Sequence, residues 1–391
     1  ILFVNLMVGG SLLTVAFQII GRRRPDFDRL ARAVAGTVTV NKSLAVVMGV
    51  GPLLAVNVYY TVYFYTANAL TGAAWMSLVP LVTLAFLITY VHKFAWDRLA
   101  HARGLHLAIG MTGAAFFLVI PLIFLANINL MLFPGRWLEV EGFFSALLLP
   151  NVWPRYLHFL AASVAITALF LLFFLLRRGC TLVDQFEELD RGSLRRLFYG
   201  IALGATGLQL AFGPLVLLTL PSQGMSWYLI GVISVGVVLA LTALHVMWRE
   251  IVAPSTRPNG RAVAVFTLIT LTAFVMGYGR HVYRESAIRE HRELMTQHTR
   301  DIGWRLAAAQ WREATGQTLV KVPLGQRIFE STCAACHAVD RVLVGPSLTE
   351  IAGLYRDDPA GIVTWTEEPY RKREGFAAMP AFKLGEDKLM A

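Results

Sequence analysis

The chain has 391 residues, of which 56% are hydrophobic and only 15% are charged, and its mean hydropathy is +0.57. This composition is too apolar for a soluble protein of this size and places much of the chain in a membrane. The net charge of +10 has to be read by its position in the chain and does not indicate a nucleic-acid-binding protein. Ile1 opens inside an apolar run and residues 383–391 begin a terminal helix, so we expect a piece of a longer chain.

Eight apolar segments are long enough, at about 20 residues each, to cross a bilayer as helices. They are residues 1–20, 43–67, 74–94, 105–130, 154–176, 197–220, 226–248 and 262–278. Glycine and proline inside them, such as Pro52 and Pro121, are tolerated in membrane helices. The sequence therefore predicts an all-α protein whose main part is a polytopic bundle of about eight membrane helices.

The loops between these segments alternate in charge. Segments 21–42, 93–104, 177–196 and 249–261 each hold several Lys or Arg residues, whereas 68–73 and 221–225 hold none and 131–153 holds only Arg136. The positive-inside rule places the basic loops in the cytoplasm. We therefore expect a multi-pass protein of the bacterial inner membrane whose eighth helix ends in the periplasm.

The composition changes abruptly after the last apolar segment. Residues 281–314 are rich in Arg, Glu, His and Ala, with Ile288, Leu294, Ile302 and Leu306 at helix-like intervals. This pattern predicts a long helix outside the membrane. We expect three parts, which are a membrane bundle over 1–280, an extramembrane helical linker over 281–320 and a small domain over 321–391.

The small domain contains Cys333-Ala334-Ala335-Cys336-His337, the spacing that attaches a c-type haem. Each cysteine thiol adds to one vinyl group of the haem, and the adjacent histidine lies under the iron as its proximal ligand. Zinc is the alternative, but a zinc site needs third and fourth ligands nearby, and the chain has only three cysteines.

The residues that flank this motif support the haem interpretation. Gly325 and Phe329 precede it, Gly345-Pro346 follows it, and Met379-Pro380 comes later, after Trp365 and Pro369. In this order they resemble a class I cytochrome c. The resemblance implies that Gly345-Pro346 orients His337 and that Met379 is the sixth iron ligand. A His/Met pair raises the reduction potential of a haem.

Stretches of the membrane part resemble subunit I of the cytochrome bd quinol oxidases. They are residues 1–6, 41–52, 94–99 with Trp96-Asp97-Arg98-Leu99, 156–162, and Tyr278-Gly279-Arg280. The resemblance implies that His158 ligates a low-spin haem b, with Met225 or His281 as the partner ligand. It also makes quinone a candidate partner. The alternative for His158 is a hydrogen-bonded histidine at the membrane interface.

Several functional residues of that family are missing. Ser77 and Ala85 fall at the positions of its acidic pair, Gly277 replaces a haem-ligating glutamate, and its external quinol loop is reduced to 221–224. The family's histidine in the first helix would precede Ile1. None of the eight apolar segments holds Asp or Glu. Because intramembrane proton delivery normally needs ionisable groups, we do not expect an oxygen-reducing centre.

Four other histidines, His92, His101, His106 and His245, lie near the basic loops. We expect them to act as interfacial cations or helix caps rather than as haem ligands. The chemistry that the sequence predicts is therefore one-electron transfer at haem iron, with haem c held by Cys333, Cys336, His337 and Met379.

The predicted function is that of a membrane-anchored c-type cytochrome. It would transfer single electrons as a subunit of a respiratory complex, in contact with the lipid bilayer, other membrane subunits and a periplasmic redox partner. The alternative is a bd-type quinol oxidase subunit with a fused cytochrome c domain. A third hypothesis is a bundle without cofactors that only anchors the haem domain.

Overall fold

The structure is a computed structural model that describes residues 2–177, 180–254, 258–315, 323–358, 360–369, 376 and 379–385. All the regular elements in these ranges are helices. The chain divides into two compact units, Ile1–Leu294 and Met295–Ala391.

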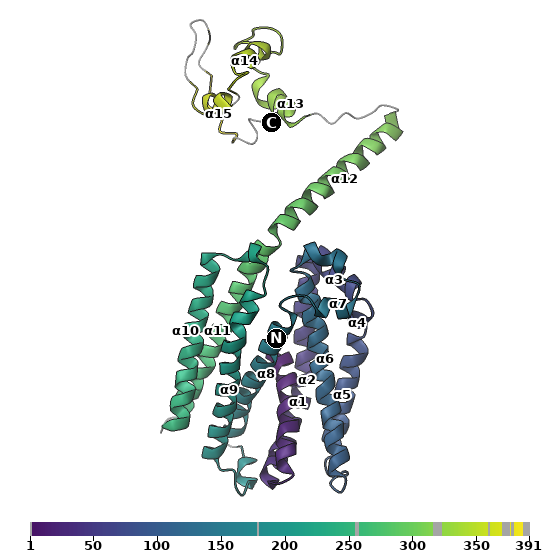
Figure 1. Ribbon diagram of the computed structural model, residues 1–391, viewed down its shortest axis with the longest axis vertical. Helices are drawn as coiled ribbons and strands as arrows, with labels where there is room; N and C mark the ends of the chain where they lie inside the picture. Colours follow the sequence, from purple (N-terminus) through teal and green to yellow (C-terminus); the bar gives the residue numbers. More distant parts are fainter. Residues whose placement is uncertain are drawn as a thin grey trace. The chain divides into compact units, whose positions relative to one another are not determined.

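The first unit is a bundle of long helices joined by short turns (Figure 1). A 3-10 turn precedes the short helix α7, and 3-10 turns also precede α9 and α10. The helices are α1 (Leu2–Gly21), α2 (Pro25–Tyr59), α3 (Thr61–Thr71), α4 (Ala73–Met76), α5 (Leu78–Phe94), α6 (Arg103–Leu130), α7 (Phe143–Leu147), α8 (Val152–Leu176), α9 (Arg191–Leu218), α10 (Trp227–Val252) and α11 (Pro258–Ala287).

Seven helical segments of the described chain are long and apolar enough to cross a membrane. They are Phe3–Gly21, Ala73–Phe94, Arg103–Leu130, Val152–Leu176, Arg191–Leu218, Trp227–Val252 and Gly260–Ala287. They match seven of the eight expected segments, so the multi-pass helical bundle is confirmed. The remaining expected segment, 43–67, falls on α2 and α3. The side chains of residues 38–48 lie outside the described residues, and this span stays a prediction.

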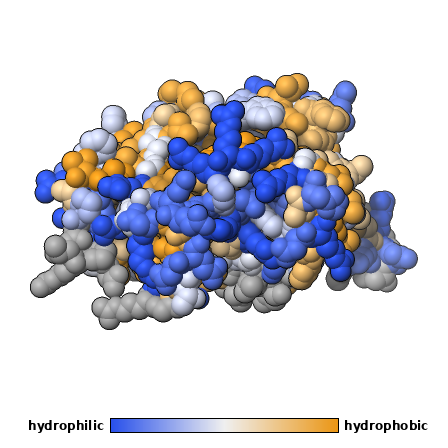
Figure 2. Space-filling view, turned by 90° about the horizontal axis from the view of Figure 1, so that it is seen from below, coloured by the Kyte–Doolittle hydropathy of each residue, from blue (hydrophilic) through white to orange (hydrophobic). Residues whose placement is uncertain are grey.

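The basic loops lie at one end of the bundle, which we call the basic end. The turns that follow α1, α5, α8 and α10 point to the lower end in Figure 1, and hydrophilic side chains cover this end in Figure 2, with hydrophobic ones around it. The alternation of loop charge in the sequence therefore follows the alternation of helix direction in the fold.

Helix α1 lies in the middle of the bundle and packs on α2, α6 and α8. Its contact with α8 is close because Gly9 has no side chain, and a Cβ there would overlap the backbone oxygen of Ser163 and the hydroxyl of Thr167. The Ser163 hydroxyl donates to the side-chain oxygen of Asn5 across the same interface, at 3.1 Å. Small residues and interhelical hydrogen bonds are the usual means of joining membrane helices.

The first unit extends beyond residue 280, where the sequence placed the end of the bundle. Helix α11 continues to Ala287, and α12 (Arg289–Thr315) begins directly after it. The start of α12 is held to the bundle by His291, whose Nδ1 lies 3.2 Å from the hydroxyl of Tyr63 on α3. The linker helix predicted after residue 281 is thus partly a continuation of the last membrane helix.

The second unit contains the rest of α12 and short helices. These are α13 (Leu324–Ile328), a π-helical turn (Phe329–Cys333), α14 (Leu348–Leu354) and α15 (Ala360–Glu367). Ser347 caps α14, because its hydroxyl accepts a hydrogen bond from the backbone N–H of Glu350 at 3.3 Å. Residues 316–322 and 386–391, which include parts of the predicted linker and terminal helix, lie outside the described residues.

The helices also extend past the apolar segments at the basic end, and this places a carboxylate on one of them. Glu250 lies on the last turns of α10, and its side chain is fully buried. It pairs with Arg195 of α9 at 3.2 Å and with Arg261 of α11 at 2.8 Å. The expectation of carboxylate-free spans therefore fails at this end, where Glu250 joins three helices.

We predict that Glu250→Gln destabilises the bundle. The change leaves Arg195 and Arg261 without their counter-charge, and breaking a buried ion pair from one side costs several kcal/mol. Because both arginines are partly exposed to solvent, we expect a loss of about 2 kcal/mol. The measurement is thermal unfolding of the purified protein in detergent.

The matched control is Asp184→Asn, which breaks the exposed pair between Asp184 and Arg191 at the same end. Exposed pairs contribute on the order of 0.5 kcal/mol. Equal losses in the two variants would show that Glu250 does not clamp the three helices.

Candidate functional site

The haem-attachment motif lies on a tight helical turn in the second unit. Cys333 ends the π-helical turn, and its carbonyl oxygen accepts hydrogen bonds from the N–H groups of Cys336 and His337, at 3.1 and 3.0 Å. Both thiols are free and half-buried. The three residues predicted to bind the haem therefore lie on one turn of backbone.

His337 is held in one orientation by the segment that follows it. Only 9% of its surface is exposed, and its Nδ1 lies 2.7 Å from the carbonyl oxygen of Pro346. Because a carbonyl can only accept, Nδ1 carries the hydrogen and Nε2 keeps its lone pair. A neutral imidazole in this form is a metal ligand whose direction is set by its other nitrogen.

Gly345 allows the backbone to lie against the imidazole ring. A Cβ at this position would overlap the ring of His337, so any other residue would push the ring away. The segment is fixed further by Gly345, whose N–H donates to the carbonyl of Cys336 at 2.8 Å. Gly345-Pro346 thus orients His337, as the resemblance to class I cytochromes c implies.

Met379 lies on a segment without regular secondary structure, which contacts α15 through Phe382. The Met379 side chain is half-buried, and the N–H of Phe382 donates to the carbonyl of Thr366 at 3.0 Å. Residues 370–375 and 377–378, including Ala378 beside Met379, lie outside the described residues. Ligation of iron by Met379 stays a prediction.

The second unit lacks a hydrophobic core of its own in the part that the structure describes. The buried side chains between residues 295 and 385 are polar, namely His337, Ser347 and Thr366. Aliphatic side chains near the motif are 46% to 60% exposed, and they are Leu324, Val339, Val342, Leu343, Val344 and Leu354. A domain this small normally needs an additional stabilising group. A large apolar macrocycle attached to the two cysteines would supply one, so these residues fit a c-type haem.

The His, Cys, Asp and Glu side chains that the structure describes do not favour the zinc alternative. They contain no group of three or more His, Cys, Asp or Glu residues arranged around one point. Burial raises the pKa of the Cys333 thiol, and neighbouring Cys336 raises it further.

His158 is half-buried on the second turn of α8, at the end of the bundle opposite the basic end. Its neighbour Arg155, one turn earlier, has a buried Nη1 without a hydrogen-bond partner, and so has Nε of Arg284 on α11. The charges of Arg155, Arg280 and Arg284 repel one another. Buried guanidinium groups without a carboxylate partner are unfavourable, so this place suits a group with anionic oxygens.

The two suggested partners of His158 lie on elements of the same end. Met225 lies between a 3-10 turn and α10 and is 37% exposed. His281 is exposed on α11, beside Arg280. The structure describes both residues, and the choice between them stays open.

Two of the histidines expected at the membrane interface are instead in the interior. His92 on α5 and His106 on α6 are 4% and 3% exposed, and both bind Gln18 of α1, at 3.0 and 2.6 Å. The expectation of interfacial cations was wrong for these two, because α1 covers them. The sequence signal was the polar series Ser11, Thr14 and Gln18 on one face of α1. His101 and His245 are exposed, as expected.

Comparison of the chain with protein-family models, with curated proteins and with solved structures finds no match. The interpretation of the site therefore rests on its own geometry.

We predict that Gly345→Ala reduces covalent haem attachment several-fold. The added methyl group displaces the His337 ring and breaks its bond to Pro346, so that Nε2 no longer points in a fixed direction. Gly353→Ala on α14 is the control, since a Cβ there meets no atom within 4 Å. Haem staining relative to protein amount measures both variants, and equal staining would contradict the role given to Gly345.

Proposed function

We propose that this protein is a membrane-anchored c-type cytochrome that transfers single electrons as a subunit of a respiratory complex. The observation that carries the proposal is the fixed His337 ring, with Nδ1 bound to Pro346 and Nε2 left as the ligand, four residues after Cys333. A free thiol pair and an exposed apolar surface around it fit the same cofactor.

The protein's part in this chemistry is to hold and tune the haem, which supplies the one-electron step when it is bound. Cys333 and Cys336 would hold it through thioether bonds, and His337 and Met379 would ligate its iron. The soft sulfur of Met379 would favour reduced iron and raise the potential. The exposed apolar side chains near the motif would cover the bound haem.

The proposed location of the haem unit is the periplasmic side of a bacterial inner membrane. Support comes from the basic loops, which gather at one end of the bundle, because such loops stay in the cytoplasm. Helix α11 ends at the opposite end, and the chain leaves the bundle there. Haem c would exchange electrons with a periplasmic partner and with other subunits in the membrane.

We predict that Met379→Ala lowers the haem potential by on the order of 0.2 V, within the range of about 0.8 V that axial ligands control. Loss of the sulfur ligand removes its preference for reduced iron and leaves the sixth position open to water or CO. A redox titration followed by absorbance, with and without CO, measures both effects.

Met295→Ala is the control for this variant, because Met295 is an exposed residue of α12 and should leave the spectrum unchanged. A wild-type potential and no CO binding in Met379→Ala would remove Met379 from the ligand set, while haem attachment at Cys333 and Cys336 could still be tested by haem staining.

A second candidate function is that of a bd-like quinol-linked subunit with a haem b in the bundle. The favouring observation is the unpartnered Nη1 of Arg155 beside His158, since a haem carries two carboxylate groups that would neutralise the nearby arginines. In this form the protein would pass electrons from quinone through haem b to haem c. Oxygen reduction is not part of the proposal, because the middle of the described spans offers no carboxylate.

We predict that His158→Ala removes haem b and leaves haem c. The pyridine haemochrome spectrum of the purified protein separates the two haem types, and the control is His245→Ala, at an exposed position of α10. If the wild-type protein contains haem c and no haem b, the bundle serves only as a membrane anchor. If a haem of the wild-type protein binds CO while Met379 is present, the result would instead favour an oxidase.

A further inference from the structure

The buried polar group at the basic end is built from three helices and is separate from both proposed haem sites. It consists of Gln18 on α1, His92 on α5 and His106 on α6, which we call the histidine triad. All three are more than nine-tenths buried. Gly110 on α6 makes room for it, since a Cβ there would lie 2.7 Å from Nε2 of His92.

The hydrogen bonds of the triad fix where its hydrogens are. Nε2 of His106 lies 2.7 Å from the backbone oxygen of His92, so this nitrogen must donate. In a neutral ring Nδ1 of His106 then accepts, and its partner at 2.6 Å is the Nε2 amide group of Gln18. The amide oxygen of Gln18 in turn accepts from Nε2 of His92 at 3.0 Å. The neutral triad is therefore a directed chain with both rings in the Nε2–H form.

The two imidazole rings cannot both be charged. They are stacked with centroids 4.3 Å apart and planes 15° apart, and two cations at that distance repel each other strongly away from bulk water. The ring of Trp96 packs against both imidazole rings in T-shaped arrangements. The ring centroids are 4.6 Å apart for Trp96 and His106, and 5.2 Å apart for Trp96 and His92. The triad can therefore take up one proton and no more.

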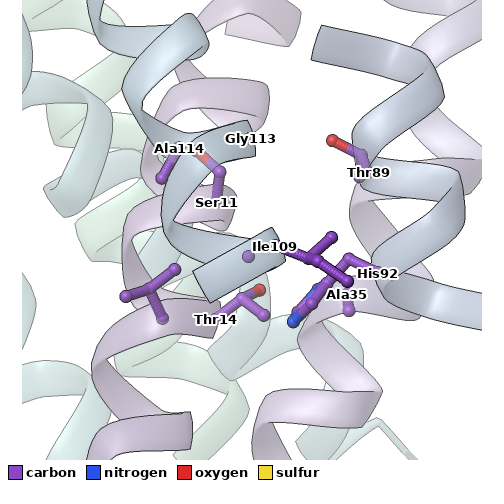
Figure 3. Close-up of a pocket in the computed structure, with 10 residues that line it drawn as sticks. Ser11, Thr14, Ala35, Thr89, His92, Ile109, Gly113 and Ala114 are labelled. Carbon is purple, nitrogen blue, oxygen red and sulfur yellow. The ribbon is translucent and has the colours of Figure 1, made fainter. Parts of the chain in front are cut away.

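Cavities lie on both sides of the triad. A pocket of about 200 Å³ at the basic end is lined by Gln18, Trp96 and His106. A second cavity of about 20 Å³, the size of one water molecule, is lined by His92 and by the hydroxyl-bearing Ser11, Thr14 and Thr89 (Figure 3). Water can thus reach His106 from the basic end, and His92 borders a small, mostly apolar cavity that has room for one water molecule.

The charged groups around the pocket come from the turn after α1, from α2, from the turn after α5 and from the start of α6. They are Arg22, Asp28, Arg29, Arg32, Asp97 and Arg103. Arg32 and Asp97 neutralise each other through two hydrogen bonds, at 2.7 and 2.6 Å. Asp28 accepts from the indole N–H of Trp96 at 3.3 Å, which places a negative charge behind the ring that touches both histidines.

We propose that the histidine triad is a proton-uptake site, in which His106 accepts one proton from water in the pocket and Gln18 passes the change on to His92. The proton adds to Nδ1 of His106, and a hydronium ion becomes water. The side-chain amide of Gln18 then has to rotate by about 180°, because its NH₂ group would otherwise face the new N–H group on Nδ1 of His106. After the turn, the Gln18 oxygen accepts from His106 and its NH₂ donates to Nε2 of His92.

The turn of Gln18 changes the form of the His92 ring. Its Nε2 can accept only after losing its hydrogen, and the neutral ring then carries a hydrogen on Nδ1, which it obtains by exchange with water. The triad as a whole gains a single proton. In the charged form His106 still donates to the backbone oxygen of His92, and Gln18 is hydrogen-bonded to both rings, so protonation of His106 and the change of form at His92 are coupled. A polar group of ionisable residues within spans is typical of proton transfer.

The test is ring ¹⁵N NMR of the full chain in lipid nanodiscs, with histidine labelled and each signal assigned by single His→Gln variants. At pH 8 we expect both rings of the triad as neutral Nε2–H forms. Between pH 8 and pH 5 we expect His106 to become an imidazolium and His92 to change to the Nδ1–H form over the same pH range. The exposed His101 serves as an internal reference.

Gln18→Leu separates the proposal from independent titration. In this variant His106 can still gain a proton, but the change at His92 should be lost. The proposal is wrong if His106 stays neutral to pH 5 while His101 titrates and the helical circular dichroism is unchanged. It is equally wrong if His106 is protonated and His92 keeps its Nε2–H form. If Gln18→Leu does not fold, the wild-type titration alone decides between these outcomes.

Discussion

Backbone hydrogen bonding inside the bilayer is the constraint on which the first unit depends. Because lipid offers no partners, each span has to satisfy its own N–H and C=O groups, and a helix does so locally. Side chains are then left to join the helices. The described bundle uses several polar contacts for this, such as Ser163 with Asn5, Asn127 with Asn68, and Glu250 with two arginines. The histidine triad also joins three helices, and it differs from these contacts because it contains two stacked imidazole rings.

The described part of the second unit lacks apolar contacts that a bound group could supply. In its described part, Pro346 and Gly345 fix the orientation of His337. Aliphatic side chains such as Val342 and Val344 are nevertheless exposed. A domain that buries little apolar surface has little to offset the loss of chain entropy on folding. Attachment of a haem at Cys333 and Cys336 would supply both the missing contacts and a covalent link, so cofactor binding and folding are expected to be coupled.

Features carried by local sequence could be predicted, and features made by contact between distant helices could not. Seven spans and the one-sided basic loops follow from composition alone, and Gly345-Pro346 lies within nine residues of the histidine that it orients. The burial of His92 and His106 depends on α1, 74 and 88 residues away from them in the chain. Glu250 was missed because α10 continues past its apolar segment. Met379 and His158 could be named from the sequence as haem ligands through the two resemblances, and both assignments stay predictions.

The two proposed haem sites and the triad differ in what their unsatisfied groups require. Near His158 a buried guanidinium nitrogen of Arg155 lacks an acceptor, and an added group with anionic oxygens would supply one. In the triad the three hydrogen bonds of Gln18, His92 and His106 are all satisfied in the neutral form, and turning the Gln18 amide gives a second arrangement that differs by one proton. Ligand sites and proton sites can be distinguished on this basis: the first have an unpaired group that a ligand would satisfy, and the second keep their hydrogen bonds when a proton is added. These two places lie at opposite ends of the described bundle. A haem b near His158 would therefore lie at the end away from the proton-uptake site, and any coupling between them would have to pass along α1 and its neighbours α6 and α8.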